Sequence, residues 1–172
     1  NYAHHTYHLP ESDIVKWISF VISMIEIILL MRVFSDLVHM VTQKSASAHS
    51  TTKTWIRLAK WWTFAMLFMA ILISVPNLNA IIHGTQLVTG HAMGTELGID
   101  TLSLFACIAF VLNDDLYRGN ELVRKRLNSG RMRFTAYWVS LAVAALVIWL
   151  SASGLATGLG RMYGEAPPLW VT

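Results

Sequence analysis

Two side chains that can bind a metal lie two residues apart in the stretch 83–100, HGTQLVTGHAMGTELGID. On an α-helix each residue turns by about 100°, so His91 and Met93 point about 200° apart. Each can therefore reach a different planar metal cofactor, such as haem, on its own side of one helix. The alternative is a core histidine bonded to a neighbouring helix, beside a methionine that only packs.

Glycines recur at every fourth residue of the same stretch, at Gly90, Gly94 and Gly98. Small residues at this spacing let another helix or a flat ring approach the backbone closely. Glu96 and Asp100 are also four residues apart and share a helix face. We expect these acids to line a polar interface to helices outside this chain, by helix–helix hydrogen bonds in preference to a proton path.

The composition of the chain is that of an integral membrane protein. Hydrophobic residues make up 55% and charged residues 13% of its 172 residues, which is too apolar for an ordinary soluble domain. The single cysteine, Cys107, excludes an internal disulfide and is expected to pack as a small apolar side chain. Because the chain starts at Asn1, we expect it to be processed or to be a piece of a longer protein.

Four hydrophobic stretches are long enough to cross a membrane, which requires roughly 20 apolar residues. Within one membrane domain, residues 1–172, we place the spans at about 14–40, 55–75, 80–113 and 134–155. The second span opens with Trp55, Trp61 and Trp62, which suit a membrane interface. The predicted fold class is therefore all-α, a polytopic bundle of about four transmembrane helices.

Lys and Arg residues gather in the connections 42–60 and 114–133, whereas the turn at 76–80 and both ends of the chain carry almost none. Since positively charged loops stay on the cytoplasmic side, both ends of the chain are expected on the outer face. The basic segment 114–133 is typical of a membrane-surface loop or a short amphipathic helix. It does not indicate a nucleic-acid partner, because no fold for one is present.

Glu26 is expected at a depth similar to that of His91, and His4 and His5 toward the outer face, where the third span begins. Glu26 lies about 18 Å along the first helix, where a carboxyl should face a polar cavity, a cofactor or a proton route. The alternative for Glu26 is a protonated carboxyl bonded to a helix backbone. His4 and His5 are adjacent before the first span, on the same outer side. They can share one metal if the backbone is irregular there, and a surface pair is the alternative.

These residues resemble the large subunit of bacterial nitric oxide reductases, within the haem-copper oxidase superfamily. The pattern His83-x-Thr85-x5-His91-x-Met93 is similar to the superfamily pattern His-x-Thr-x5-His-x-His. The adjacent histidines before a helix with a mid-membrane acid look like the family's paired-histidine segment. The resemblance covers the whole chain but only the C-terminal part of the family's helix set, in a haem-copper-oxidase-like bundle.

The resemblance implies that His91 binds a high-spin haem and that His4 and His5 hold a non-haem iron or copper. His83 would lie near the haem propionates and a structural calcium. The superfamily usually has a second histidine where Met93 stands, so we predict that Met93 is an axial ligand of a low-spin haem. The implied reaction reduces nitric oxide to nitrous oxide in a bacterial inner membrane, with electrons from cytochrome c or a quinol.

The family's earlier helices, which carry the remaining ligands, are absent from these 172 residues. Another chain, or further helices of a longer protein, would have to complete the site within the surrounding lipid. Glu26 would then belong to the catalytic cavity. The alternatives are an oxygen-reducing or other nitric oxide-converting member of the superfamily, and a non-catalytic membrane subunit whose histidines only bond neighbouring helices.

Overall fold

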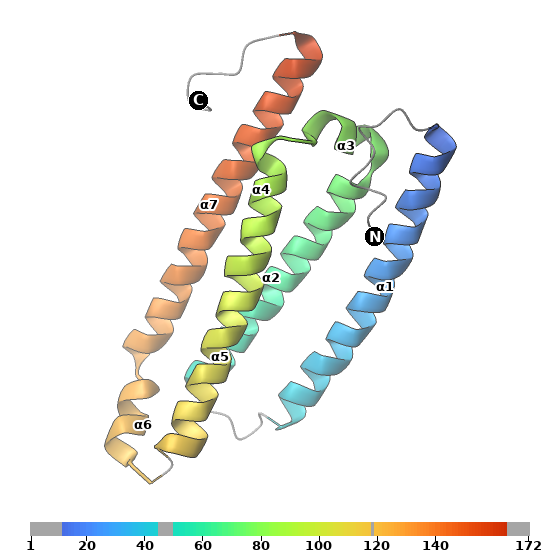
Figure 1. Cartoon of the computed structure of the whole chain (residues 1–172). Helices are drawn as coiled ribbons and strands as arrows, with labels where there is room; N and C mark the ends of the chain where they lie inside the picture. Colours follow the sequence, from blue (N-terminus) through green and yellow to red (C-terminus); the bar gives the residue numbers. More distant parts are fainter. Residues whose placement is uncertain (1–11, 45–49, 118, 165–172) are drawn as a thin grey trace. The chain divides into compact units, whose positions relative to one another are not determined.

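The regular secondary structure of the chain is helical throughout the part that the computed structural model describes, residues 12–44, 50–117 and 119–164 (Figure 1). This confirms the all-α prediction. Four helical stretches are long and apolar enough to cross a membrane, as predicted: Asp13–Arg32, Ser50–Ser74, Gln86–Val111 and Glu121–Tyr163.

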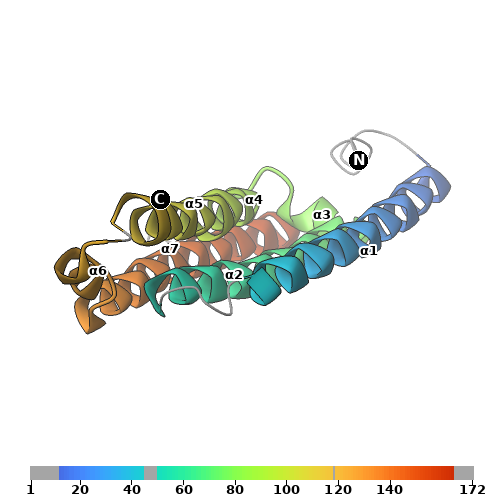
Figure 2. The same cartoon turned by 90° about the horizontal axis from the view of Figure 1, so that it is seen from below.

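The helices follow one another along the chain with short connections. Their bounds are α1 Asp13–Lys44, α2 Ser50–Ser74, α3 Pro76–Ile82, α4 Gln86–Met93, η3 Gly94–Asp100, α5 Thr101–Val111, η4 Leu112–Leu116, α6 Glu121–Leu127 and α7 Gly130–Tyr163. The two η segments are π-helices. The stretch from α4 to η4 is one continuous helical rod, whose α4 and α5 parts are labelled in Figure 2.

The third predicted span begins later than expected, because the chain breaks between α3 and α4. Pro76 occupies the start of α3, where its missing N–H costs nothing. The buried Asn79 side chain donates a hydrogen bond of 2.8 Å to the carbonyl of Ile73 at the end of α2. This bond satisfies a carbonyl that has lost its helical partner.

The chain divides into two compact units. The first unit consists of the described parts of Asn1–Ser35, Ala65–Ala92 and Leu146–Thr172, and the second consists of those of Asp36–Phe64 and Met93–Ala145.

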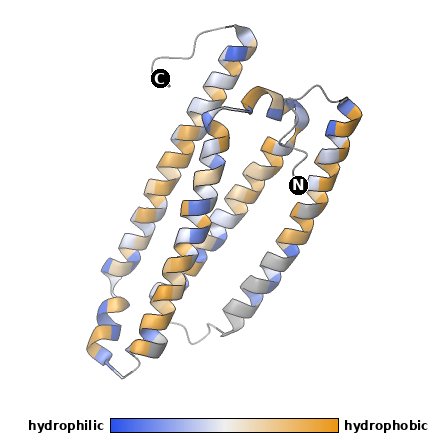
Figure 3. Cartoon of the chain, in the orientation of Figure 1, coloured by the Kyte–Doolittle hydropathy of each residue, from blue (hydrophilic) through white to orange (hydrophobic). Residues whose placement is uncertain are grey.

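Large apolar side chains are exposed along the long helices, which are coloured largely as hydrophobic in Figure 3. Examples are Ile14 at 72% exposed, Phe68 at 64% and Ile148 at 68%. A water-soluble protein seldom exposes apolar surface on this scale. Such exposed apolar side chains are compatible with a lipid environment around the helices.

Candidate functional site

His91 lies on the flank of a closely packed helix face. Its neighbour Gly90 is buried, and a Cβ added there would lie 3.1 Å from Leu150 Cβ and 3.2 Å from Ser151 Oγ. The Gly90 face of α4 is therefore filled by α7. Because successive residues turn by about 100°, His91 points to one side of this face, and its side chain is half-buried.

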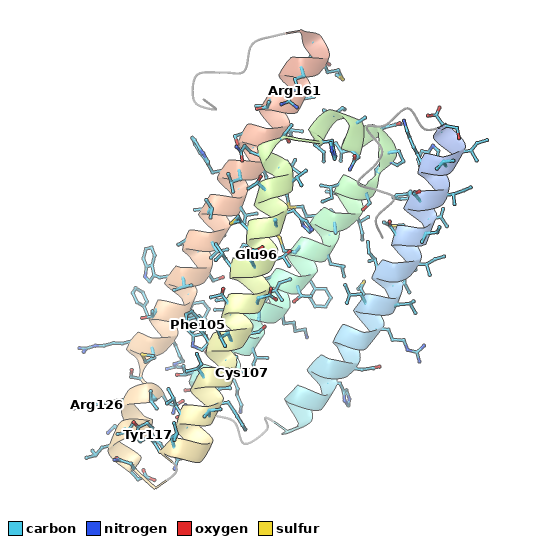
Figure 4. All side chains as sticks on the ribbon, viewed as in Figure 1. Glu96, Phe105, Cys107, Tyr117, Arg126 and Arg161 are labelled. Carbon is cyan, nitrogen blue, oxygen red and sulfur yellow. The ribbon has the colours of Figure 1, made fainter. Side chains whose placement is uncertain are left out.

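Glycines of α7 hold the segment before His91 even more closely. A Cβ added at Gly154 would lie 2.0 Å from the backbone nitrogen of Leu87, and one at Gly158 would lie 2.6 Å from the carbonyl oxygen of Ile81. The two glycines are four residues apart, the spacing that brings helices into backbone contact. Arg161, labelled in Figure 4, donates a hydrogen bond of 3.5 Å to the carbonyl of His83.

Thr85, the threonine of the predicted pattern, starts α4. Its hydroxyl donates to the Ile82 carbonyl at 2.7 Å and accepts from the Leu87 amide at 3.3 Å. A side-chain oxygen that accepts from an amide of the first turn stabilises a helix start. Gly84 supplies the left-handed backbone of the turn, with φ at +68°. His83 precedes this turn and is half-buried.

Met93 is the last residue of α4, and its side chain is half-buried. His91 and Met93 thus both belong to the regular α-helical part of the rod, as the prediction of opposite directions requires. The helix widens directly afterwards into η3, where the Thr101 hydroxyl donates to the Glu96 carbonyl five residues earlier, at 2.9 Å. Glu96 and Asp100 are both exposed.

The glycines that recur at every fourth residue contact different groups in the two units. Gly90 is occupied by α7, whereas Gly98 is occupied by a flat ring, the indole of Trp62. A Cβ added at Gly98 would lie 2.4 Å from Trp62 Cδ2. Trp62 is 8% exposed and Trp55 6%, so these two rings pack inside the second unit, whereas Trp61 is 68% exposed.

Sequence reasoning missed the π-helices, although these are frequent at functional sites. No residue pattern marks the widening at η3, although its two glycines, Gly94 and Gly98, are both buried. Cys107, which was expected to pack as a small apolar side chain, is exposed among the described residues.

Three of the predicted site residues have no described side chain. His4 and His5 lie outside the described residues, and of Glu26 only the backbone is described, within α1. Among the side chains that are described, no three or more His, Cys, Asp or Glu lie together as a metal-binding group. The shared metal of His4 and His5 and the role of Glu26 therefore stay predictions.

A flat ring needs space beside the imidazole that binds it. Val88, one turn before His91, is 36% exposed, and Ala92, which follows His91, is exposed as well. The described residues of the first unit thus leave the flank that bears His91 partly uncovered. An imidazole on such a flank, within a membrane-length helix, fits a haem ligand.

No protein-family model, curated protein or solved structure matches this chain.

Proposed function

We propose that this chain carries the haem- and metal-binding histidines of a membrane nitric oxide reductase-like enzyme. The observation that carries the proposal is the placement of His91 and Met93. Both are half-buried in the α-helical part of one membrane-length rod, and they flank the packed Gly90 face on opposite sides. Two planar cofactors on opposite sides of one helix require this arrangement.

In the proposed site the chain's own residues bind and orient. His91 would bind a high-spin haem, Met93 would bind a low-spin haem, and His83 would help to hold the propionates and a structural calcium. His4 and His5 would hold a non-haem iron or copper, and the two metal centres would supply the redox chemistry that reduces nitric oxide to nitrous oxide with electrons from the donor. The close contact of α7 with α3 and α4 fixes the backbone that bears both His83 and His91.

Glu26 provides the polar or protonic environment of the cavity in this proposal. An ionisable side chain inside a membrane helix faces a cavity or a partner and not lipid. Its register agrees with that role, because it follows Ser19 and Ser23 by seven and three residues, the spacing of one helix face. Both serines are only 4% exposed.

The remaining ligands would come from another chain or from further helices of a longer protein. The electron donor would be a cytochrome c or a quinol, and the site would lie in a bacterial inner membrane with both ends of the chain on the periplasmic side. Oxygen reduction, or another conversion of nitric oxide, would use the same residues. These alternatives differ in substrate and not in the ligands that this chain supplies.

The second candidate is a non-catalytic membrane subunit. One observation favours it: Thr85 is engaged in starting α4, so this part of the pattern has a structural use of its own. In this alternative His83 and His91 only bond neighbouring helices, and the complex contains no haem that depends on them.

Haem content separates the two candidates. We expect a pyridine haemochrome assay on the purified native complex to detect haem, and His91→Ala to lose the high-spin haem. His39→Ala is the matched control, because His39 is an exposed histidine of α1, and it should keep the wild-type haem content. In the same preparations Glu26→Gln should slow turnover without loss of haem. A purified complex that contains no haem would contradict the enzymatic proposal.

Met93 gives the sharper spectroscopic test. A thioether ligand raises the potential of a haem relative to a second imidazole. We therefore expect Met93→His to remove the far-red band of thioether-to-iron charge transfer and to lower the midpoint potential of the low-spin haem. Met69→Leu on α2 replaces another half-buried methionine and should change neither. A spectrum and potential indifferent to Met93→His would show that the ligand comes from elsewhere.

A further inference from the structure

Two long helices of the second unit lie side by side at the ends where they begin. The Thr51 hydroxyl, near the start of α2, donates to the Leu127 carbonyl at 2.8 Å. The Thr51 amide donates to the Asn128 side chain, just before α7, at 3.3 Å. Further along, the Trp62 indole donates to the Ser140 hydroxyl at 2.9 Å. The first parts of α2 and α7 therefore run in the same direction as a pair within this unit.

Cations gather between these contacts. Arg57 of α2 donates a hydrogen bond to the Tyr137 hydroxyl of α7. Lys60 lies about one turn after Arg57 on α2. Arg133 lies about one turn before Tyr137 on α7, on the same face of that helix. All four side chains are exposed. We call Arg57, Lys60 and Arg133 the cation cluster.

The cation cluster faces away from the helical rod that carries Glu96 and Asp100. The Trp55 ring packs against Phe105 of that rod, with 5.0 Å between the ring centroids. Arg57 follows Trp55 by two residues and therefore points about 200° away from it. Neither α2 nor α7 contains an Asp or a Glu. These two helices therefore offer no carboxylate that could neutralise the cluster.

Apolar side chains continue the same surface toward the middle of the two helices. Phe64 lies one turn after Lys60 on α2 and is 41% exposed. Leu141 lies one turn after Tyr137 on α7 and is 56% exposed. Trp138, at 55% exposed, is an aromatic side chain of the kind that gathers at membrane interfaces. The surface thus passes from cations through aromatic rings to apolar side chains, which matches the order of groups in a phospholipid.

We propose that the cation cluster binds the phosphate of an anionic phospholipid from the surrounding membrane, and that its acyl chains lie along Phe64 and Leu141. Charge complementarity selects this ligand. The guanidinium groups of Arg57 and Arg133 match phosphate oxygens in geometry, and Tyr137 holds the first of them in place.

The expected orientation of the chain agrees with this ligand. The distribution of Lys and Arg predicts that α2 and α7 begin on the cytoplasmic side. Anionic lipids of the cytoplasmic leaflet attract Lys and Arg near the membrane surface, and basic pockets between transmembrane helices bind their headgroups. The inference goes beyond the proposed function, because it involves none of the haem or metal ligands.

Photolabelling by a lipid tests the proposal. The purified native complex is placed in phosphatidylcholine nanodiscs that contain phosphatidylglycerol with a diazirine on one acyl chain. After irradiation, the labelled peptides are identified by mass spectrometry. We expect the label on α2 and α7 near Phe64 and Leu141. Phosphatidylcholine with the same diazirine, at equal content, is the control for contact without headgroup recognition. It should label these positions about tenfold less.

Variants test the part that the charges play. Arg57→Gln combined with Arg133→Gln should lower labelling by phosphatidylglycerol about tenfold, because each Arg near the surface strengthens anionic-lipid binding several-fold. Arg57→Lys combined with Arg133→Lys keeps both charges and should retain most of the labelling. Lys125→Gln combined with Arg126→Gln removes the same charge from the exposed side of α6, where Figure 4 labels Arg126. It should leave the labelling of α2 and α7 unchanged.

Four results would overturn the inference. The first is equal labelling of α2 and α7 by the two lipids, which would mean that only acyl chains make contact. The second is no labelling by either lipid, as a protein partner on this surface would give. The third is an equal loss in the α6 variant, which indicates a diffuse attraction to basic surface. The fourth is wild-type labelling in the Arg→Gln variant. The comparison of the two lipids uses the wild type, so it decides even where a variant fails to fold.

Discussion

The two units hold their helices together by different means. In the first unit α7 meets α3 and α4 through glycine, with Gly154 and Gly158 lying directly against the backbone of the other segment. In the second unit the helices meet through side chains that reach across. The indole nitrogen of Trp62 donates to the Ser140 hydroxyl at 2.9 Å, and the guanidinium of Arg57 donates to the Tyr137 hydroxyl.

This difference has consequences for the site. We call Gly154 and Gly158, with the backbone that they contact, the glycine seam. A backbone contact has no side chain that can rotate away, so the glycine seam fixes the segment from Ile81 to Leu87 against α7. A contact made by long side chains can adjust by rotamer changes. We therefore expect substitutions in the glycine seam to lower the free energy of unfolding most. Substitutions in the polar contacts of the second unit should lower it less.

The largest effect is expected at Gly154. Any Cβ there would lie 2.0 Å from the Leu87 amide nitrogen, so α7 must move away from α4. Gly154→Val should cost at least about 3 kcal/mol of unfolding free energy, the upper range of overpacking, and should lower the yield of folded protein. The measurement is thermal unfolding of the purified protein by circular dichroism, with the membrane yield beside it.

Gly130→Ala is the matched control on the same helix, because a Cβ at Gly130 meets nothing within 4 Å. It should leave the melting temperature within experimental error of the wild type. If Gly154→Val melted like Gly130→Ala, the close approach of α7 to α4 would be wrong.

A smaller effect is expected at Gly98, where the obstacle is a ring and not a backbone. Gly98→Ala should cost about 1–3 kcal/mol, because the new methyl group overlaps the Trp62 indole. In a Trp62→Leu background the same substitution should cost much less, since the ring is gone. A double-mutant cycle on melting free energies measures the coupling, and a coupling near zero would contradict the contact.

Much of the fold could be predicted from the sequence, because membrane spans depend on hydrophobicity summed over some 20 residues. The four long apolar helices were predicted correctly, and of the two alternatives for the basic segment, a loop or a short helix, the structure has the helix α6. The break at residues 83–85 was not, because it depends on Gly84 and Thr85 acting together in a turn. The use of Trp55 and Trp62 in packing also depends on tertiary neighbours.

The candidate site could be predicted only as a set of residue types and directions. Helix geometry gives the opposite directions of His91 and Met93 from their spacing alone. The spacing could not show which group would pack against each of the glycines at every fourth residue. Gly90 contacts a helix, whereas Gly98 contacts an indole ring. The η3 widening also escaped prediction, because five-residue hydrogen bonding has no residue pattern of its own.

The smallest effect is expected in a polar network of the second unit. Asn128 donates to the Asn113 side-chain oxygen at 2.6 Å and accepts from the Thr51 amide at 3.3 Å. Asn113 is only 1% exposed, and its own amide donates to the Ala109 carbonyl at 2.6 Å. The network links the start of α2 to the end of the rod and to the turn before α7.

Asn128→Ala removes the donor to a buried oxygen, and an unsatisfied buried acceptor costs about 1–3 kcal/mol. We expect a melting temperature lower than the wild type but higher than that of Gly98→Ala, because the substitution removes hydrogen bonds without forcing a ring or a helix to move. Adding Asn113→Leu should restore part of the loss, since it removes the acceptor that was left unsatisfied. If the double variant were less stable than Asn128→Ala by the full cost of a second lost hydrogen bond, the two asparagines would act independently. The second unit would then be held by separate contacts and not by a network.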